Sequence, residues 1–289
     1  MLLLKNSNNA NRIWRMIIVA IIGYIVISIV TVVTPGLLFS FITKVSFNAA
    51  LDVIMQSILA QIFIMIVTLI LIYYWIKLLL DKEETVIYTI GFTGRYFLKV
   101  LSGFTFGSIF ILLVLAPLYL SHSYVLEYRV LDDKVVSVLI AGLFNYVTVA
   151  FAEEIIFRGY IQYQTSKKNK VIGCIITAMI FALFHLMNSS YSYLSLIYLF
   201  VGGMMFSTMR LATKSLMFPM GFHLAWNWLL SSIFGIDSDR AWLRTTISKD
   251  TWWNGGGIGA ESSIFGLIIM ILATGGFMYA YFHSIGKKE

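Results

Sequence analysis

Polar side chains that could carry out chemistry occur in three segments of the sequence that are otherwise apolar. An ionisable group inside a membrane-spanning stretch is costly, so it usually faces the interior of a helix bundle and marks a site or a pathway. The three segments read AFAEEIIFRGY, FALFH and HLAWN, and their polar residues are Glu153, Glu154, Arg158, His185, His223 and Asn227. These residue types predict one buried site for acid–base chemistry.

The two adjacent glutamates are expected to have different tasks. Glu154 and Arg158 are four residues apart with the acid first, which is the order that supports an ion pair on one helix face. Neighbouring residues on a helix point about 100° apart, so Glu153 must face another direction. Glu154 is therefore predicted to be the structural partner of Arg158, while Glu153 is predicted to meet the polar residues of the other two segments.

Those residues can reach Glu153 if their helices run side by side. With a rise of about 1.5 Å per residue, the polar residues of the three segments fall very roughly 14 to 22 Å from the cytoplasmic ends of their helices. His223 and Asn227 are four residues apart and share one helix face. By contrast, His122 and His283 have no such polar neighbours in the sequence and are expected to be packing residues.

This combination of side chains suits amide hydrolysis. A carboxylate and an imidazole held together away from bulk water can activate a water molecule, with the carboxylate as the general base. Two donors on one helix face, here His223 and Asn227, can stabilise the oxygen that becomes negative when water adds to a peptide carbonyl.

A zinc-dependent form of the same reaction stays open. Glu153, His185 and His223 could bind Zn²⁺ and leave a fourth position for water. The sequence has no HExxH motif, the usual metallopeptidase arrangement, so metal-free activation of water is preferred. It also has no GxSxG or GxGD motif, which removes the support for a serine or an aspartyl intramembrane protease.

In chain order, EEIIFRG, FALFH and HLAWN resemble the EExxxR, FxxxH and HxxxN motifs of the CPBP family. This family includes CAAX prenyl endopeptidases, bacteriocin-processing and bacteriocin-immunity proteins, and abortive-infection-like proteins. The resemblance covers residues 151–227, and GGGIGAE at 255–261 is similar to a weaker glycine–acid element near the last helix of many members. It implies an intramembrane endopeptidase, which is described for the family either as a metallopeptidase or as a glutamate-dependent enzyme.

The resemblance also implies a role for each site residue and a class of substrate. It implies that Glu153 and His185 activate water and that His223 and Asn227 stabilise the oxyanion. Glu154 and Arg158 would be supporting residues. The short loops and small size are similar to those of a bacterial member. The expected substrate is therefore a membrane-associated peptide or protein, such as a pheromone or bacteriocin precursor, rather than a prenylated CAAX protein.

The composition places this chemistry in a membrane. Of the 289 residues, 59% are hydrophobic and 12% are charged, about half the charged share of a soluble domain. A helix needs roughly 20 residues to cross the hydrocarbon core, and about eight apolar stretches approach or exceed that length, at residues 13–33, 53–75, 100–120, 135–163, 171–187, 194–209, 215–235 and 264–283. Strands are not expected, because open sheet edges cannot be satisfied in lipid.

The predicted fold class is therefore all-α, a polytopic transmembrane helical bundle in one domain. Residues 1–99 would hold two accessory spans, and residues 100–289 would form the core that carries the three motifs. The single cysteine, Cys174, allows no intramolecular disulfide and no CxxC metal pair.

The positive charges predict the orientation of the chain. Short loops rich in Lys and Arg stay cytoplasmic, and 15 of the 21 such residues fall on one alternating side of the eight spans when Arg158 is counted. Both termini are therefore expected in the cytoplasm, in a multi-pass protein of the cell membrane. This distribution accounts for the net charge of +7, so the expected partner is the lipid bilayer and not nucleic acid.

Two other classes of function compete with a peptidase. A non-enzymatic bacteriocin-immunity or scaffold protein could use the same fold, although the complete set of catalytic residue types argues against it. A proton-coupled transporter would use intramembrane glutamate and histidine as a relay. The sequence shows no inverted repeat and no matching pair of broken helices, which disfavours the transporter.

Overall fold

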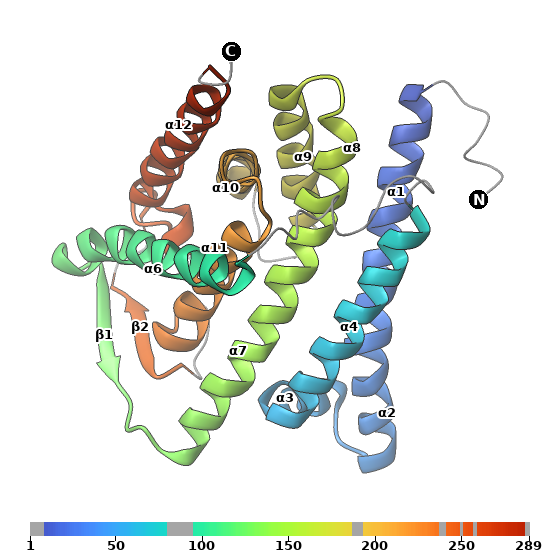
Figure 1. Ribbon diagram of the computed structural model, residues 1–289. Helices are drawn as coiled ribbons and strands as arrows, with labels where there is room; N and C mark the ends of the chain where they lie inside the picture. The colour runs from blue at the N-terminus through green and yellow to red at the C-terminus, as the bar shows by residue number, and fades with distance from the viewer. Residues whose placement is uncertain are drawn as a thin grey trace.

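Helices make up almost all of the computed structural model, with one short β-ribbon outside the long apolar helices (Figure 1). The predicted all-α class is confirmed. The structure describes residues 9–79, 95–186, 193–236, 241–248, 251–256 and 259–286, with the backbone alone described for 9–13, 16, 193, 194 and 261.

The described helices follow one another along the chain in numerical order. They are α1 (Asn9–Ser28), α2 (Thr34–Thr43), α3 (Phe47–Gln56), α4 (Ile58–Leu79), α6 (Tyr96–Leu120), α7 (Asp133–Glu153), α8 (Gln162–Thr165), α9 (Lys170–His185), α10 (Tyr193–Thr213), α11 (Met217–Trp228) and α12 (Ile264–Gly286). Wider π-helical turns continue some of them without a break, at Ile29–Val33 between α1 and α2, at Glu154–Ile161 between α7 and α8, and at Leu229–Ile233 after α11.

Six of the eight predicted spans correspond to helices long and apolar enough to cross a membrane. Within the described chain these are Ile17–Thr43, Ile58–Leu79, Tyr96–Leu120, Asp133–Thr165, Ser195–Thr213 and Ile264–Gly286. The stretches predicted at 171–187 and 215–235 also contain helices: α9 has 16 residues, and α11 together with the π-helical turn that continues it covers Met217–Ile233. Both are shorter than the roughly 20 residues of a full crossing.

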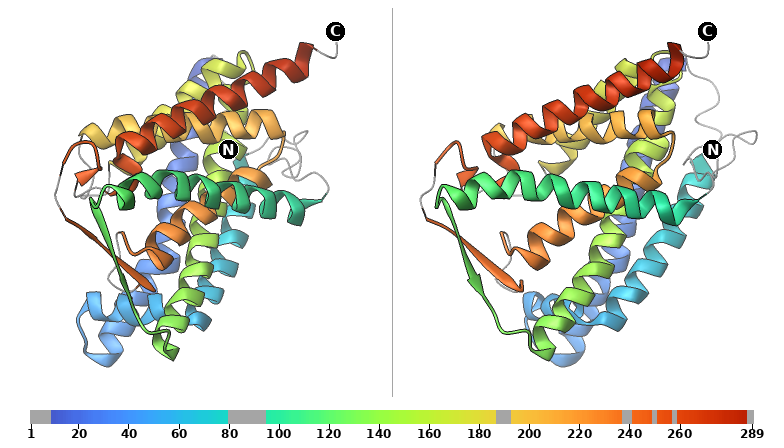
Figure 2. Two further views of the ribbon diagram at one scale, coloured as in Figure 1. Left: turned by 90° about the vertical axis from the view of Figure 1, so that its left-hand side faces the viewer. Right: turned by 60° about the vertical axis from the view of Figure 1, so that its left-hand side comes forward.

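The helices form two groups that diverge from one another. In Figure 1, α1, α4 and α7 run in a similar direction, with α4 packed on α7, while α6 lies across them. Figure 2 shows that α10 and α12 follow the direction of α6 more closely than that of α7. The shorter α11 packs against α6 of one group and α7 of the other, and α9 packs on α10. The polar motifs on α7, α9 and α11 therefore lie where the two groups meet.

Close contact between α6 and α11 depends on glycine. A Cβ atom at Gly103 would overlap the carbonyl oxygen of Phe218, and a Cβ atom at Gly221 would overlap that of Val100. Small residues let membrane helices approach backbone to backbone. The contacts at Gly103 and Gly221 therefore fix the position of α11, which carries two of the candidate site residues.

A two-stranded ribbon is the element that sequence analysis missed. β1 (Tyr124–Tyr128) and β2 (Leu243–Ile247) pair antiparallel, from Tyr124 opposite Ile247 to Tyr128 opposite Leu243. Strands were rejected because a sheet edge is not tolerated in lipid, but this ribbon lies in the connections between the apolar helices. β1 follows the end of α6 and precedes α7 (Figure 1).

One charge was assigned to the wrong environment. Arg158 was counted with the cytoplasmic loops, but it lies inside the bundle and is only 1% exposed. Some of the counted charges lie outside the described residues. On the predicted cytoplasmic side these are Lys5, Lys82, Lys287 and Lys288, and on the opposite side they are Arg240 and Lys249. The orientation of the chain stays a prediction.

Cysteine labelling in intact cells tests this orientation. In a background where buried Cys174 is replaced by Ser, a cysteine at Lys168 or at Lys288 should resist an impermeant thiol reagent, because both positions are expected in the cytoplasm. A cysteine at Ser248, next to β2, should be labelled. Permeabilised cells serve as the control, since Lys168→Cys should then label; labelling at that position in intact cells would contradict the topology.

Candidate active site

The first polar segment lies where α7 changes into a π-helical turn. Glu153 is the last residue of α7, and Glu154 begins the π-helical stretch that ends at Ile161. Such π-helical turns often occur at functional sites. The motif sequence itself gave no signal for the wider turn, because its apolar spacing also fits an ordinary α-helix.

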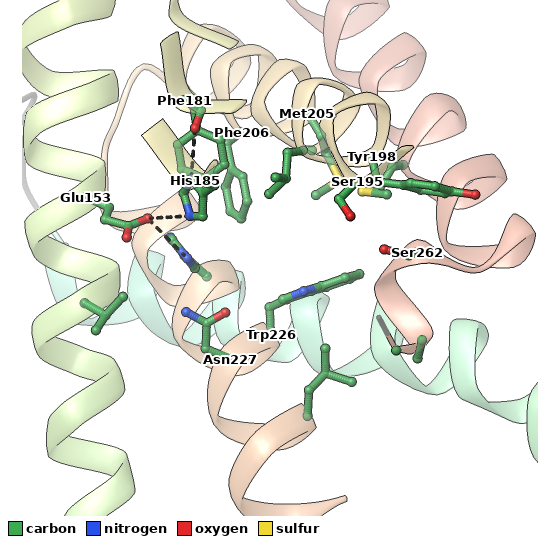
Figure 3. Close-up of a pocket in the computed structure, with 18 of the residues that line it drawn as sticks. Glu153, Phe181, His185, Ser195, Tyr198, Met205, Phe206, Trp226, Asn227 and Ser262 are labelled. Atoms are coloured by element: carbon green, nitrogen blue, oxygen red, sulfur yellow. Dashed lines mark hydrogen bonds and ion pairs between the residues drawn. The ribbon is translucent and has the colours of Figure 1, made fainter. Parts of the chain in front are cut away.

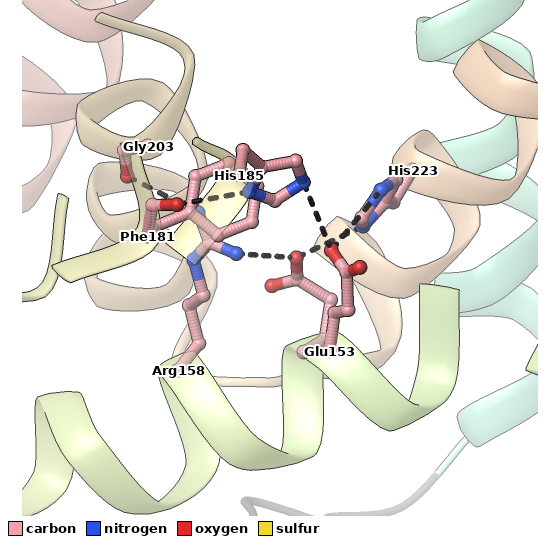
Figure 4. A network of polar contacts seen from close by, with 7 residues as sticks. Glu153, Arg158, Phe181, His185, Gly203 and His223 are labelled. Carbon is pink, nitrogen blue, oxygen red and sulfur yellow. Dashed lines mark hydrogen bonds and ion pairs between the residues drawn. The ribbon is translucent and has the colours of Figure 1, made fainter. Parts of the chain in front are cut away.

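The ion pair predicted between Glu154 and Arg158 is present and fully buried. An Arg158 guanidinium nitrogen donates to Glu154 Oε1 at 2.9 Å, and both side chains are 0% exposed (Figure 4). The guanidinium carbon lies 4.3 Å from the ring centre of Phe181 and 4.9 Å from that of Phe206. A second guanidinium nitrogen donates to the carbonyl of Gly203 at 3.4 Å, which ties the pair to α10.

Both candidate histidines are oriented through their Nδ1 atoms. His223 Nδ1 lies 3.2 Å from Glu154 Oε1, and His185 Nδ1 lies 2.9 Å from the carbonyl oxygen of Phe181. An ionised carboxylate and a carbonyl can only accept hydrogen bonds, so each Nδ1 is the protonated, donating nitrogen. The contact between His223 and Glu154 was not expected from the sequence, where Glu154 was paired with Arg158 alone.

Glu153 faces the opposite nitrogen of each ring. Its Oε2 atom lies 3.9 Å from His185 Nε2 and 4.0 Å from His223 Nε2 (Figure 4). These separations are too long for direct hydrogen bonds, but a water molecule can bridge polar atoms at such distances. Oε2 is buried and makes no hydrogen bond within the described chain. The geometry thus leaves one carboxylate oxygen and two imidazole nitrogens directed at the same small volume.

A cavity of about 580 Å³ opens in front of these groups. Glu153, His185, His223 and Asn227 all line it, so the structure brings together the four residues predicted to meet (Figure 3). Glu154 is absent from the lining, as expected for a residue turned toward an ion pair inside the bundle. The volume lies in the usual range for pockets that hold small ligands or a few residues of a peptide.

The candidate donor atoms lie farther apart than the ligands of a bound zinc ion. Tetrahedral zinc, with ligands at about 2.0 to 2.2 Å, places neighbouring donors about 3.4 Å apart. The distances from Glu153 to His185 and His223 exceed this by about half an ångström. In the part of the chain that the structure describes, no group of three or more His, Cys, Asp or Glu side chains is placed to hold a metal ion.

The other two histidines lie away from this site. Neither His122 nor His283 lines the cavity. The ring of His283 stacks on Tyr279 at 5.8 Å between centres, near the end of α12.

Several cavity residues carry no recognisable motif. Ser195, Tyr198, Gly202 and Met205 of α10 line the side away from Glu153. Their spacing follows one face of a helix, but every packed helix shows that pattern, so it could not identify them as site residues.

Comparison with known proteins gives one match. Residues 135–229 match the family model described as Rce1-like, "Type II CAAX prenyl endopeptidase Rce1-like". This segment runs from the start of α7 to just beyond α11 and contains the three polar motifs. No curated protein and no solved structure matches the chain.

The two glutamates should respond differently to the same substitution. Glu153→Gln is nearly isosteric and removes only a potential base, so we expect loss of hydrolytic activity with nearly normal abundance and thermal stability. Glu154→Gln leaves Arg158 without its counter-ion in a low-dielectric interior, which typically costs about 3 to 5 kcal/mol. Yield from membranes and thermal unfolding in detergent measure the difference; equal stability and equal catalytic loss in the two variants would disprove the division.

Proposed function

We propose that the protein is an intramembrane endopeptidase. The chain carries a domain of the Rce1-like family of type II CAAX prenyl endopeptidases, which confirms its resemblance to the CPBP family. It is an integral membrane protein with six helices suited to crossing a bilayer among its described residues, and we place it in the cell membrane. The proposed reaction is hydrolysis of peptide bonds in membrane-associated peptides or proteins. The observation that carries this proposal is the approach of Glu153 Oε2 to both imidazole Nε2 atoms at 3.9 and 4.0 Å inside the cavity.

Glu153 and His185 would activate the attacking water. A water molecule between them can donate one hydrogen to Glu153 Oε2 and the other to the unprotonated His185 Nε2, because His185 Nδ1 holds the ring proton. As the water oxygen bonds to the peptide carbonyl carbon, its proton passes to Glu153. Burial of this carboxylate, which is 7% exposed, keeps bulk water from competing for it.

His223 and Asn227 would stabilise the oxyanion that forms in this step. Since His223 Nδ1 already donates to Glu154, donation from Nε2 requires the ring to carry both protons. A ring in that form would lie between the two carboxylates of Glu153 and Glu154. The amide nitrogen of Asn227 would be the second donor. Glu153 then returns its proton to the leaving nitrogen as the carbon–nitrogen bond breaks, and the remaining hydroxyl proton passes to His185 Nε2, which yields a carboxylate and an amine.

The substrate would be a peptide that reaches the cavity from the membrane. Apart from Glu153 and the two histidines, the described lining is aromatic, aliphatic or neutral and polar. Such a lining fits an apolar peptide segment, such as a pheromone or bacteriocin precursor. The match to a prenyl endopeptidase family makes a prenylated CAAX peptide the other substrate to test.

Hydrolysis in H₂¹⁸O tests the proposed activity. The full-length protein in detergent would be incubated with farnesylated CAAX peptides and, separately, with unmodified apolar peptides. We expect wild-type protein to cut an internal peptide bond in one of the two sets and to place a single ¹⁸O atom in the new carboxylate, measured by mass spectrometry. Glu153→Gln, purified in the same way, should give neither product nor label. Cleavage of neither set by the wild type would favour the immunity or scaffold function.

Kinetics of Asn227→Ala test the oxyanion assignment. A donor that acts on charge developing in the transition state lowers kcat by about a hundredfold to a thousandfold when removed, with a smaller effect on KM. Asn48→Ala, an exposed asparagine on α3, is the matched control and should behave as wild type. An increase in KM with unchanged kcat would mean that Asn227 only binds the substrate.

Metal analysis of the same preparations separates this mechanism from a zinc mechanism. In the metal-free reaction a chelator leaves activity intact, and His223→Ala slows turnover without changing metal content. The zinc mechanism predicts stoichiometric zinc that is lost in His223→Ala, and activity that a chelator removes and Zn²⁺ restores. Those results would show that a metal-bound water, and not a water activated directly by Glu153, attacks the peptide bond.

A further inference from the structure

The glycine-rich segment before the last helix forms part of the cavity wall. We use "glycine loop" for residues 251–256 and 259–263, the described parts of this segment. Gly255 has φ +88° and Gly259 has φ +107°, backbone conformations that residues with a side chain rarely adopt. A Cβ atom at Gly255 would also overlap the carbonyl oxygen of Gly259. The glycines therefore permit a tight turn that other residues would prevent.

Hydrogen bonds hold the glycine loop in one conformation. The Asn254 side-chain oxygen accepts from the backbone N–H groups of Thr251 at 3.2 Å and Gly256 at 3.1 Å. The hydroxyl of Tyr124 on β1 donates to the Asn254 carbonyl at 2.9 Å, so the ribbon anchors the loop. Ser263 immediately precedes α12, and its hydroxyl accepts from the backbone N–H of Gly266 at 3.1 Å. The loop is thus preorganised at both ends.

This conformation directs Ser262 to the cavity. Gly259, Ala260 and Ser262 line the cavity, and Ser262 is held by a hydrogen bond from its backbone N–H to the carbonyl of Gly259 at 3.0 Å. Figure 3 draws Ser262 and Ser195 of α10 on the side away from Glu153, with their hydroxyl groups directed inward. Both residues are buried, with exposures of 4% and 1%.

Among the residues whose side chains the structure describes, which exclude Glu261 of the glycine loop, the side of the cavity near this loop differs chemically from the catalytic side. Except for tyrosine, the ionisable residues in the described lining are Glu153, His185 and His223, which all lie on the catalytic side. The opposite side combines serine hydroxyls, each able to donate and to accept, with apolar side chains such as Met270.

We propose that the glycine loop and α10 form a specificity subsite for a neutral hydrogen-bonding side chain of the substrate: Ser, Thr, Asn or Gln. Ser262 and Ser195 are its specificity-determining residues. The subsite rests on the proposed peptidase function and adds a preference for one class of substrate side chain. A site built to hydrogen-bond a substrate group discriminates against an analogue that lacks the group, because a buried polar atom, here the Ser262 hydroxyl, then loses that partner. Valine or leucine at the same substrate position would be the disfavoured analogue.

A scan of one peptide position measures this preference. The probe is a pool of apolar peptides with a leucine–alanine–valine frame, in which each position in turn carries Ser, Thr, Asn, Gln, Val, Leu, Asp or Lys. Wild-type protein should cut peptides with a neutral polar residue at one position relative to the cleaved bond better than those with Val or Leu there. Ser262→Ala should reduce this preference by about three- to tenfold, as expected for one neutral hydrogen bond. Ser284→Ala, on α12 but outside the cavity lining, should preserve it.

A binding measurement keeps the subsite separate from the proposed activity. Immobilised Glu153→Gln protein would capture peptides from the same pool, and the Glu153→Gln, Ser262→Ala double variant would be compared with it. Selective capture that the double variant loses supports the subsite even if wild-type protein cleaves nothing, an outcome that would overturn only the peptidase function. Where Ser262→Ala lowers thermal stability, Ser195→Ala provides the same comparison from α10.

Three results would overturn the subsite itself. These are equal capture and cleavage of polar and apolar peptides by the parent proteins, an unchanged preference in both serine variants, and a preference for Asp or Lys over the neutral polar residues.

Discussion

The buried ion pair between Arg158 and Glu154 is the interaction on which the arrangement of the bundle depends. A guanidinium group that is withdrawn from water needs a counter-ion and further hydrogen-bond partners nearby, and leaving it unpaired is strongly destabilising. Arg158 meets this need with Glu154 from its own helix, the carbonyl of Gly203 on α10 and the rings of Phe181 and Phe206. The π-helical turn, α9 and α10 are thereby held at one place around a single charged group.

That constraint also orients the candidate catalytic groups. Glu154 Oε1 accepts from both Arg158 and His223 Nδ1, so the residue that neutralises the arginine also directs the imidazole. Glu153, one residue earlier, points elsewhere and takes no part in the pair. Two adjacent carboxylates in one apolar interior are compatible because one of them is committed to a cation. The other keeps an oxygen directed at the two Nε2 atoms.

Sequence reasoning reached the site through its local spacings. The four-residue separation of Glu154 and Arg158 predicted a contact within one helix, and the structure confirms it at 2.9 Å. The meeting of Glu153 with the histidines was predictable because apolar helices of limited length bring polar groups at similar depth together. The contact between His223 and Glu154 was not, since it depends on how α11 is rotated against α7, which local spacing does not specify.

The rest of the fold was harder to predict because its causes are long-range. β1 and β2 are five-residue segments more than a hundred residues apart, and neither carries a turn or alternation signal strong enough to predict pairing. The stretches predicted at 171–187 and 215–235 are helical over most of their length, but apolar composition continues through the point where α11 widens into a π-helical turn and could not locate it. The opposite wall of the cavity was missed for a related reason: its residues on α10 are spaced as in any packed helix.

The cavity is lined by two parts of the chain that are held in place by different interactions. All the candidate catalytic residues fall within residues 135–229, which match the family model, whereas Gly259, Ala260, Ser262 and Met270 lie beyond it. The catalytic side is constrained by a buried charge network in which each group restricts the next. The glycine loop is constrained by backbone geometry and by its hydrogen bond from Tyr124. A substitution at Ser262 can therefore alter what the cavity accepts without disturbing the carboxylates and imidazoles that would carry out the reaction.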